Sequence, residues 1–507
     1  MPASRRAPLG ELRARRTAAA GAFAAVAAAL VLAGCAHSMS GMRAGPGTAP
    51  SPSDAWTPPA GERMPAPRTA GPEGIPADLL DPSGKPTLTR LVDLALRTSP
   101  ATRETWASAR SAEGALGRER GAYYPSVDLE ASVVRAEGSA AGGKIAYEQT
   151  SYGPSLVVQH LLFDLGGRRA SVDEARLALI GANWRHNAAV QDVVLGVVEA
   201  YIRYVAVEAL LGARRDALEE ARAGLDAATA RHEAGVATIA DVLQTKTALA
   251  RAQLGVDEAE GGIHVARGAL ATAVGLPANA PLDVETPVND LDIEPLAQDV
   301  DRLLEEAQRA SPDLAASRSA AAEAWSRVEK VESEGRPSLA FGGEAGRVWY
   351  GDGDLFQNTY SAGLFLRVPL FAGFSRRYDE ARARADAEAA DARVDSLRQR
   401  IVYRVWAGYY EARTAAQKVR TVETLVESAS QSSEVALGRY RAGVGGLVDL
   451  LVAQAALSSA RAERVAARAE WYLSLARLAR DTGTLWPRPG GPRAAVPPAD
   501  GTTGGAP

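Results

Sequence analysis

The stretch Ala234-Gly235-Val236, followed by Asp241, recurs 208 positions later as Ala442-Gly443-Val444, followed by Asp449. Self-similarity at a fixed spacing indicates an internal duplication, so this chain of 507 residues is predicted to consist mainly of two copies of one unit. Further pairs of matching residues are 212 positions apart up to Ser126 and 208 positions apart from Phe163 onward. The change of four positions indicates that the loop between these points is shorter in the second copy. These pairs are Phe163 with Phe371, Arg168 with Arg376, Arg169 with Arg377, Ser99-Pro100 with Ser311-Pro312, and Pro125-Ser126 with Pro337-Ser338.

Each copy contains two runs with the period of a β-strand. After Pro125 the apolar residues alternate with Asp128 and Glu130, and they are Val127, Leu129, Ala131 and Val133. A glycine-containing loop at 138–143 and a second run at 156–163 follow, and the second copy has the runs 339–348 and 360–371. A period of two predicts strands with one polar and one aliphatic face. We therefore expect four strands in all.

The period becomes helical after each pair of strands. The apolar or small residues of the second copy follow spacings of three and four, and they are Val394, Leu397, Ile401, Val405, Gly408, Ala412, Ala415, Val419, Val422 and Val426. Their counterparts in the first copy are Val193, Val197, Ala200, Tyr204, Val207, Leu211, Leu218 and Leu225. This pattern is typical of a coiled coil. A helix over 166–233 would be about 100 Å long at 1.5 Å per residue, so it must pack against other long helices.

The long helices are predicted to reverse direction at their glycines. Gly235 and Gly443 permit the positive φ that a tight turn requires. Return helices are expected over 240–274 and 447–482. The fold class is therefore mainly α with a small β part, in two tandem repeats of strand, strand, long helix, turn and helix.

The first 35 residues have the pattern of an export signal. Arg13 to Arg16 precede the apolar run 18–31, which ends in Leu32-Ala33-Gly34-Cys35. A charged region, a short apolar region and a small-residue cleavage site are typical of a signal peptide. Because the residue after the cleavage site is the single Cys of the chain, the pattern predicts a bacterial lipoprotein with diacylglycerol and N-acyl lipid on Cys35. An ordinary signal peptide with a chance Cys is the alternative, and Arg15-Arg16 leaves Sec and twin-arginine export open.

Composition divides the remainder of the chain. Proline and glycine are dense in 41–86 and 487–507, which opposes helix and sheet. The predicted organisation is a signal peptide at 1–34, a lipidated tether at 35–86, a first repeat at 87–280 with strands at 125–163 and helices at 164–275, a linker at 281–300, a second repeat at 301–486 with strands at 337–371 and helices at 374–482, and a disordered tail at 487–507.

Four strands cannot close a barrel alone, and an open sheet in lipid would leave backbone groups unpaired. Three copies would supply twelve strands, which is within the range of outer-membrane barrels. Tyr123, Tyr124, Trp349 and Tyr350 lie at strand ends, where interfacial aromatic residues are expected.

With these residues in place, the sequence over 87–486 resembles the outer-membrane efflux protein family of TolC-like trimeric ducts. Together with Cys35, it is most similar to the lipoprotein branch that serves resistance-nodulation-division pumps. The resemblance implies a homotrimer whose twelve-stranded barrel continues into a periplasmic α-helical barrel, a periplasmic adaptor and an inner-membrane pump as partners, and passive conduction across the outer membrane. It also implies that the tips, Ala234, Gly235, Val236, Ala442, Gly443 and Val444, contact the adaptor. Ala-Gly-Val replaces the Val-Gly-Thr or Val-Gly-Leu often found in the family.

The resemblance also marks Asp241 and Asp449 as candidates for a pore constriction. Three copies of Asp449 would form a carboxylate ring that favours cations. A second carboxylate of the family is Val452 here, which weakens the ring. The alternative role is stabilisation of a helix N-terminus by an acidic residue.

Other classes fit the sequence less well. The net charge of −4 argues against a nucleic-acid partner. The five histidines are scattered and catalytic motifs are missing, so neither an enzyme nor a metal or other cofactor site is predicted. A periplasmic adaptor lipoprotein and the exit duct of a type I protein secretion system remain as alternatives, whereas a coiled-coil structural protein does not explain the paired strands. The exported cargo is not specified by any motif.

Overall fold

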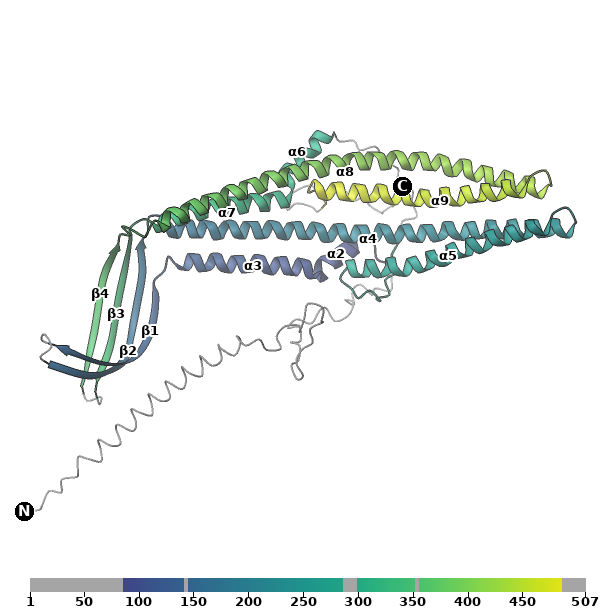
Figure 1. Ribbon diagram of the computed structural model, residues 1–507. Helices are drawn as coiled ribbons and strands as arrows, with labels where there is room; N and C mark the ends of the chain where they lie inside the picture. The colour runs from purple at the N-terminus through teal and green to yellow at the C-terminus, as the bar shows by residue number, and fades with distance from the viewer. Residues whose placement is uncertain (1–84, 141–144, 286–298, 352–354, 486–507) are drawn as a thin grey trace, which may run out of the picture. The chain divides into compact units, whose positions relative to one another are not determined.

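The computed structural model describes residues 85–140, 145–285, 299–351 and 355–485. These residues lie in one compact unit, Gly74–Pro507. The predicted signal peptide, Cys35, the tether up to residue 84, most of the linker at 281–300 and the C-terminal tail lie outside the described residues. The elements in chain order (Figure 1) are α2 Leu88–Thr98, α3 Pro100–Gly121, β1 Ser126–Ala140, β2 Ile145–Phe163, α4 Gly167–Glu233, α5 Ile239–Ala273, α6 Val300–Ala310, α7 Pro312–Glu334, β3 Ser338–Tyr350, β4 Leu355–Arg367, α8 Ser375–Arg441 and α9 Leu447–Asp481.

The two repeats have matching helices. The long helices α4 and α8 have 67 residues each, and the return helices α5 and α9 have 35 residues each. All four pairs of helix ends are 208 positions apart. The predicted fold class, mainly α with a small β part in two tandem repeats, is confirmed.

Each repeat also has two helices before its strands, which the sequence periodicity did not predict. Ser99-Pro100 separates α2 from α3, and Ser311-Pro312 separates α6 from α7. Proline is favourable at the first position of a helix because its missing N–H needs no partner there, and the residue before it is pushed out of the helical region. The repeated Ser-Pro pair is therefore a helix boundary in both copies.

The four strands form one antiparallel sheet in the order β1-β2-β3-β4. β1 pairs with β2 from Ser126 with Gln159 to Ala140 with Ile145, so the strands extend beyond the predicted runs. The predicted strand 360–371 was wrong at both ends, since β4 begins at Leu355 and ends at Arg367. Pro369 lies just beyond and has no N–H to donate to a neighbouring strand.

The corner between sheet and helix has the same backbone form in both repeats. Leu165 and Gly166 have φ of 51° and 104°, and their counterparts Gly373 and Phe374 have 60° and 64°. An arginine in the next turn fixes each corner. Arg168 donates to the carbonyl oxygens of Ala122 and Leu162, and Arg376 donates to those of Gly335 and Pro369.

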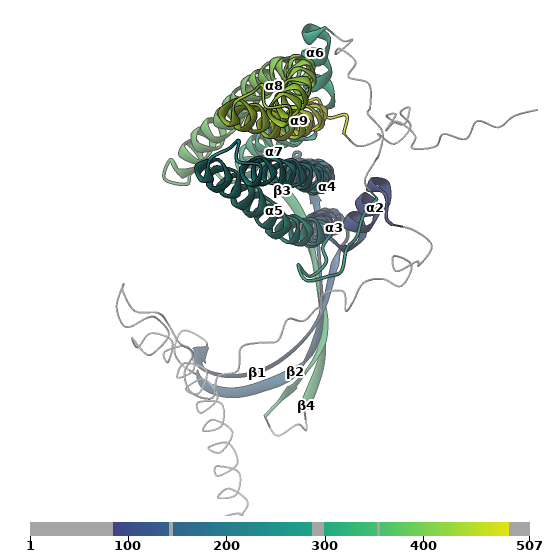
Figure 2. The same ribbon diagram turned by 90° about the vertical axis from the view of Figure 1, so that its right-hand side faces the viewer.

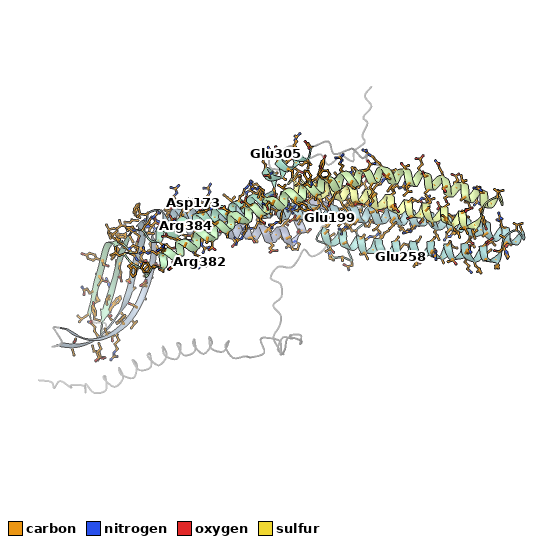
Figure 3. The ribbon with its side chains drawn as sticks, turned by 45° about the horizontal axis from the view of Figure 1, so that its top comes forward. Asp173, Glu199, Glu258, Glu305, Arg382 and Arg384 are labelled. Carbon is orange, nitrogen blue, oxygen red and sulfur yellow. The ribbon has the colours of Figure 1, made fainter. Side chains whose placement is uncertain are left out.

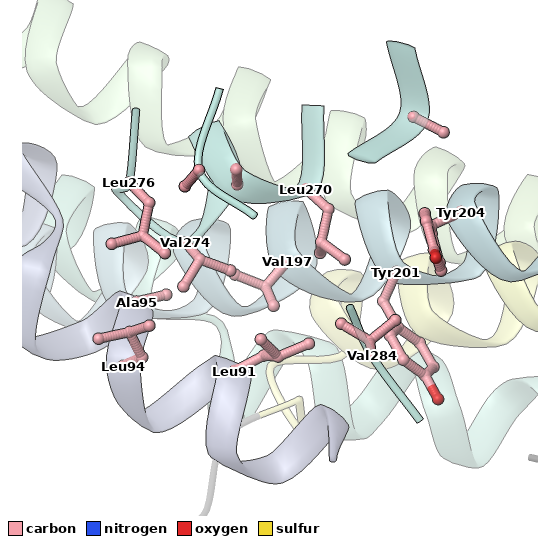
Figure 4. Packing of buried hydrophobic residues seen from close by; sticks show 13 residues of the cluster. Leu91, Leu94, Ala95, Val197, Tyr201, Tyr204, Leu270, Val274, Leu276 and Val284 are labelled. Carbon is pink, nitrogen blue, oxygen red and sulfur yellow. The ribbon is translucent and has the colours of Figure 1, made fainter. Parts of the chain in front are cut away.

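Small apolar clusters along the helices replace a single central core. The largest joins α2, α4 and the end of α5, with Leu91, Val197 and Leu270 fully buried (Figure 4). On α8 the predicted stripe is buried at Ile401, Val405, Ala412, Ala415, Val419 and Val422. Ile401 and Val405 cluster with residues of α6, α7 and α9, and Ala415, Val419 and Val422 cluster with residues of α9. The periodicity therefore identified the packing face of the long helices.

The helices lie side by side as two hairpins, α4 with α5 and α8 with α9, and α4 contacts α9 (Figures 1 and 2). Charged side chains line the outer surfaces of these helices (Figure 3). Several of them pair between helices, as Arg384 does with Glu332 at 2.8 Å and Arg477 with Glu199 at 2.8 Å. These ion pairs join neighbouring helices of the bundle.

Candidate functional site

The two turns at the far end of the hairpins have the same hydrogen bonds. After α4, the N–H of Gly235 bonds to His232 and that of Val236 bonds to Arg231, each to the carbonyl oxygen at 2.9 Å. After α8, Gly443 and Val444 bond in the same way to Tyr440 and Arg439. Gly235 and Gly443 have φ of 74° and 79°, as a helix C-terminus of this type requires. Val236 and Val444 are left exposed at the tips.

The two tips differ in how their return helices begin. Thr238 and Asp241 form a capping box, in which each side chain accepts the other's backbone N–H, at 3.3 and 3.2 Å. The second return helix begins at Leu447, and the residue before it, Gly446, has no side chain to act as a cap. Asp241 is thus engaged in local capping, whereas Asp449 lies exposed in the first turn of α9. Two exposed valines, Val448 and Val452, lie on the same helix beside it.

A contact that the sequence did not predict joins the two hairpins at the tips. The Arg231 guanidinium donates to the Tyr440 carbonyl oxygen and stacks over the Tyr440 ring, 4.8 Å from its centroid. Tyr440 is buried together with Ala228 of α4 and Leu447 and Leu450 of α9. The repeat predicts this contact only in part. Arg231 has a counterpart in Arg439, but the next position is His232 in the first copy and Tyr440 in the second, so the aromatic partner occurs only in the second copy.

Tyr440 occupies an unusual position in this contact. Its hydroxyl is buried and has no hydrogen-bond partner among the described residues. Burial raises the pKa of Tyr440, and the nearby carboxylate of Asp241 raises it further, while Arg231 lowers it. Two charged residues at the first tip, Asp241 and Arg231, therefore act on the Tyr440 hydroxyl at the second tip.

Polar contacts continue between α4 and α9 behind the tips. Arg461 pairs with Glu220 at 2.9 Å, and Gln454 donates to the Glu220 carbonyl oxygen at 2.9 Å. Arg214 donates to Ser458 at 3.4 Å. Burial raises the pKa of Glu220 although Arg461 opposes the shift. These contacts hold the two hairpins together along their length.

The register of the sheet separates its side chains into two faces, because directly paired residues point to the same side. We call one the apolar face; it includes Val127, Leu129, Val133, Leu156, Val158, Phe341, Leu364 and Leu366. The other, the polar face, includes Asp128, Glu130, Ser132, Ser155, Gln159, Glu344, Thr359 and Ser361. The sheet is therefore amphipathic, as the alternation predicted.

Aromatic side chains lie at both ends of the strands. Tyr123 and Tyr124 are exposed before β1, and the ring of Tyr123 lies 4.8 Å from the Arg168 guanidinium. At the opposite end, Tyr152 and Trp349 stack with their centroids 6.0 Å apart. Tyr350 follows Trp349 and therefore points to the polar face. The register thus places Trp349 on the apolar face and Tyr350 on the polar face, and the interfacial role of the four aromatic residues stays a prediction.

The described ranges contain no group of three or more His, Cys, Asp or Glu side chains arranged to hold a metal ion. Within the same ranges, no helix is both long and apolar enough to span a membrane. Four of the histidines lie on three elements: His160 on β2, His186 and His232 far apart on α4, and His264 on α5.

The family match divides into two segments, one in each repeat. The model of the family described as outer membrane efflux protein matches residues 91–276 and 303–484. The chain is 32% identical to protein CyaE of Bordetella pertussis over 417 residues, which cover 81% of this chain and 86% of that protein. It is 27% identical to the alkaline protease secretion protein AprF of Pseudomonas aeruginosa over 345 residues, or 66% of this chain and 70% of that one. The crystal structure of the outer membrane protein VceC of Vibrio cholerae superposes with a TM-score of 0.71 at 21% identity, covering 78% and 96% of the two chains.

Proposed function

The chain belongs to the outer membrane efflux protein family, and we propose that three copies of it form an outer-membrane exit duct. The amphipathic sheet with two open edges carries this proposal. Within the described chain the outer edges of β1 and β4 have no strand partner, and unpaired backbone groups in lipid cost several kcal/mol each. Three sheets joined edge to edge satisfy these groups in a twelve-stranded barrel, with the polar face toward a watery lumen and the apolar face toward lipid.

The helices extend the duct into the periplasm. At 1.5 Å per residue, α4 and α8 are each about 100 Å long, which is long enough to cross much of the periplasmic space. The duct itself conducts passively, and the energy for export comes from an inner-membrane pump connected through a periplasmic adaptor. The fold and family are those of a channel and not of an enzyme.

The tips are the proposed site of adaptor contact. Ala234, Gly235 and Val236 and their counterparts Ala442, Gly443 and Val444 end the hairpins, and exposed Val236 and Val444 offer apolar contact surface. Asp449 is the better candidate for a constriction, because its side chain is exposed whereas that of Asp241 caps α5. Three copies of Asp449 close to the axis would favour cations.

Cys35 is the proposed lipid attachment site. The support is the sequence pattern alone, since a charged region and a short apolar run precede the only Cys in the chain. Diacylglycerol and N-acyl lipid on this residue would anchor the N-terminus to the outer membrane beside the barrel.

The cargo is proposed to include polypeptides. One relative is named for alkaline protease secretion, which favours a type I secretion pump over the resistance-nodulation-division pump suggested by the lipoprotein pattern. Drug-sized molecules are the second candidate.

Gel mobility with and without heating, cross-linking and membrane fractionation test the duct. The full-length protein should migrate as a trimer from the outer membrane, and Cys35→Ala should lose the acyl mass while its trimer persists. A monomer or hexamer in the inner-membrane fraction would support the adaptor alternative. Cells that lack the gene and retain a normally secreted protease inside the cell would identify polypeptide cargo.

A further inference from the structure

Arg347 lies on the apolar face of the sheet. It is paired with Asn358 of β4, and the neighbouring pairs on the same face are Trp349 with Phe356 and Ala345 with Tyr360. If the apolar face meets lipid, as the proposed function requires, a guanidinium here lies against the membrane. A charge in that position is costly unless a partner of opposite charge compensates it.

The neighbours of Arg347 hold the guanidinium without neutralising it. Its Nε donates to Asn358 Oδ1 at 2.9 Å, and its centre lies 4.9 Å from the Phe356 ring and 5.9 Å from the Trp349 ring. Among the described residues no carboxylate forms an ion pair with it, and its two Nη groups meet no acceptor. Arg135 lies at the same end of the sheet, but unlike Arg347 it forms an ion pair, with Glu148.

The position along the strands places this guanidinium at the edge of the apolar band. Ten residues separate Leu339, paired with Leu366, from Trp349, paired with Phe356. At about 3.3 Å per residue and a tilt of about 40°, this distance corresponds to about 25 Å along the membrane normal. That height equals the lipid-facing band of an outer-membrane barrel. The Arg347 side chain reaches the Trp349–Phe356 row, so its charge lies where the lipid headgroups begin.

We propose that Arg347, with Asn358 and the rings of Trp349 and Phe356, binds the phosphate of an anionic lipid in the outer leaflet. A phosphate accepts two parallel hydrogen bonds from a guanidinium fork, which are the donors that Arg347 leaves free. The rings fix the orientation of the fork and provide an apolar surface for the adjoining acyl chains. This inference rests on the proposed orientation of the barrel.

The binding of lipid A to the purified full-length trimer tests the proposal. Native mass spectrometry would compare bisphosphorylated lipid A with lipid A from which both phosphates have been removed. The unmodified channel should prefer the phosphorylated form by roughly tenfold, as expected for charge-assisted hydrogen bonds. Arg347→Gln should abolish this preference, and Arg347→Lys, which keeps a charge but loses the fork, should retain only part of it. Arg135→Gln is the matched control and should keep it.

Several outcomes would overturn the proposal. A phosphate preference that survives in Arg347→Gln, or that Arg135→Gln loses to the same extent, would exclude Arg347 as the binding group. A loss of trimer heat stability in Arg347→Gln with unchanged lipid preference would assign the guanidinium to a carboxylate of the channel itself. Failure of the unmodified chain to form a trimer would refute the duct, and the lipid site with it, whereas loss of preference in a normal trimer concerns the lipid site alone.

Discussion

Replacing Arg231 by alanine should loosen the junction between the two hairpin tips. The side chain makes two interactions with one residue of the other repeat, a hydrogen bond to the Tyr440 carbonyl oxygen and a stack over the Tyr440 ring. Tyr440 is itself buried against Ala228, Leu447 and Leu450. The substitution therefore removes the polar part of the contact and leaves the apolar part in place.

The magnitude follows from the two interactions. A hydrogen bond from a charged donor contributes about 1.5–3 kcal/mol, and a cation–π contact at a partly exposed site adds about 0.5–1 kcal/mol. Because Arg231 is only half-buried, the lower end is appropriate, and we expect a loss of about 2 kcal/mol in the free energy of local opening. At 1.36 kcal/mol per factor of ten, this corresponds to roughly 30-fold faster amide exchange.

Hydrogen exchange measured on the trimer would test this expectation at the Gly443 and Val444 amides, which bond to the carbonyl oxygens of Tyr440 and Arg439. Arg439→Ala is the matched control, since Arg439 is the repeat counterpart of Arg231 but only donates to Val444 within its own turn, at 3.5 Å. Because that hydrogen bond is long and exposed, the control should change the exchange of the same two amides less than threefold. If Arg231→Ala leaves the exchange of both amides within a factor of two, the contact does not stabilise the tip and the reasoning is refuted.

Three further expectations follow from the same structure. Leu270→Ala removes a fully buried side chain from the cluster of α2, α4 and α5 and should lower the free energy of unfolding by roughly 2–5 kcal/mol in denaturant titrations; a change below 1 kcal/mol would contradict the packing. Arg376→Ala deletes two hydrogen bonds to the carbonyl oxygens of Gly335 and Pro369 and should lower trimer stability by about 2 kcal/mol, whereas the same change at exposed Arg377 should be near neutral, and equal effects would argue against the corner role. Burial raises the pKa of Asp481 above 3.8 although Arg404 and Arg480 oppose the shift. The contribution of this shift to stability is therefore fully present below pH 3.8 and is lost as the pH rises through the folded-state pKa. Asp481→Asn should remove this part of the pH dependence of unfolding, and parallel plots of stability against pH for the two proteins would exclude the role of Asp481.

Much of the fold was predictable because its determinants are local or periodic. The offset of 208 predicted two equal units, and the structure gives α4 and α8 identical lengths. The strand alternation after Pro125 predicted which residues share a face, and the register agrees. Helices α2, α3, α6 and α7 were not assigned, because they are short or carry a mixed pattern that periodicity does not separate from its surroundings. The end of β4 was misplaced because apolar residues continue past the point where Pro369 stops the pairing.

The candidate site was predictable only as far as its turns. Ala234-Gly235-Val236 and Ala442-Gly443-Val444 identify the tips from sequence, since a glycine with positive φ is a local requirement. The different environments of Asp241 and Asp449 depend on whether a threonine or a glycine occupies the cap position just before the return helix. That difference is also readable from sequence, but only once the first residue of each helix is known.

The sequence by itself determined the repeat, the long helices, the positions of their turns and the two faces of the sheet, because each depends on residues close together in the chain. The tertiary structure alone decided that Arg231 meets Tyr440 and that Arg347 lies between Asn358, Trp349 and Phe356, with no carboxylate of the described residues paired to it. These contacts depend on how two repeats with nearly identical patterns pack, and on a strand register that pairs residues across a turn. Periodicity specifies which face of an element packs, but the partner on that face is chosen by the packing of the whole unit.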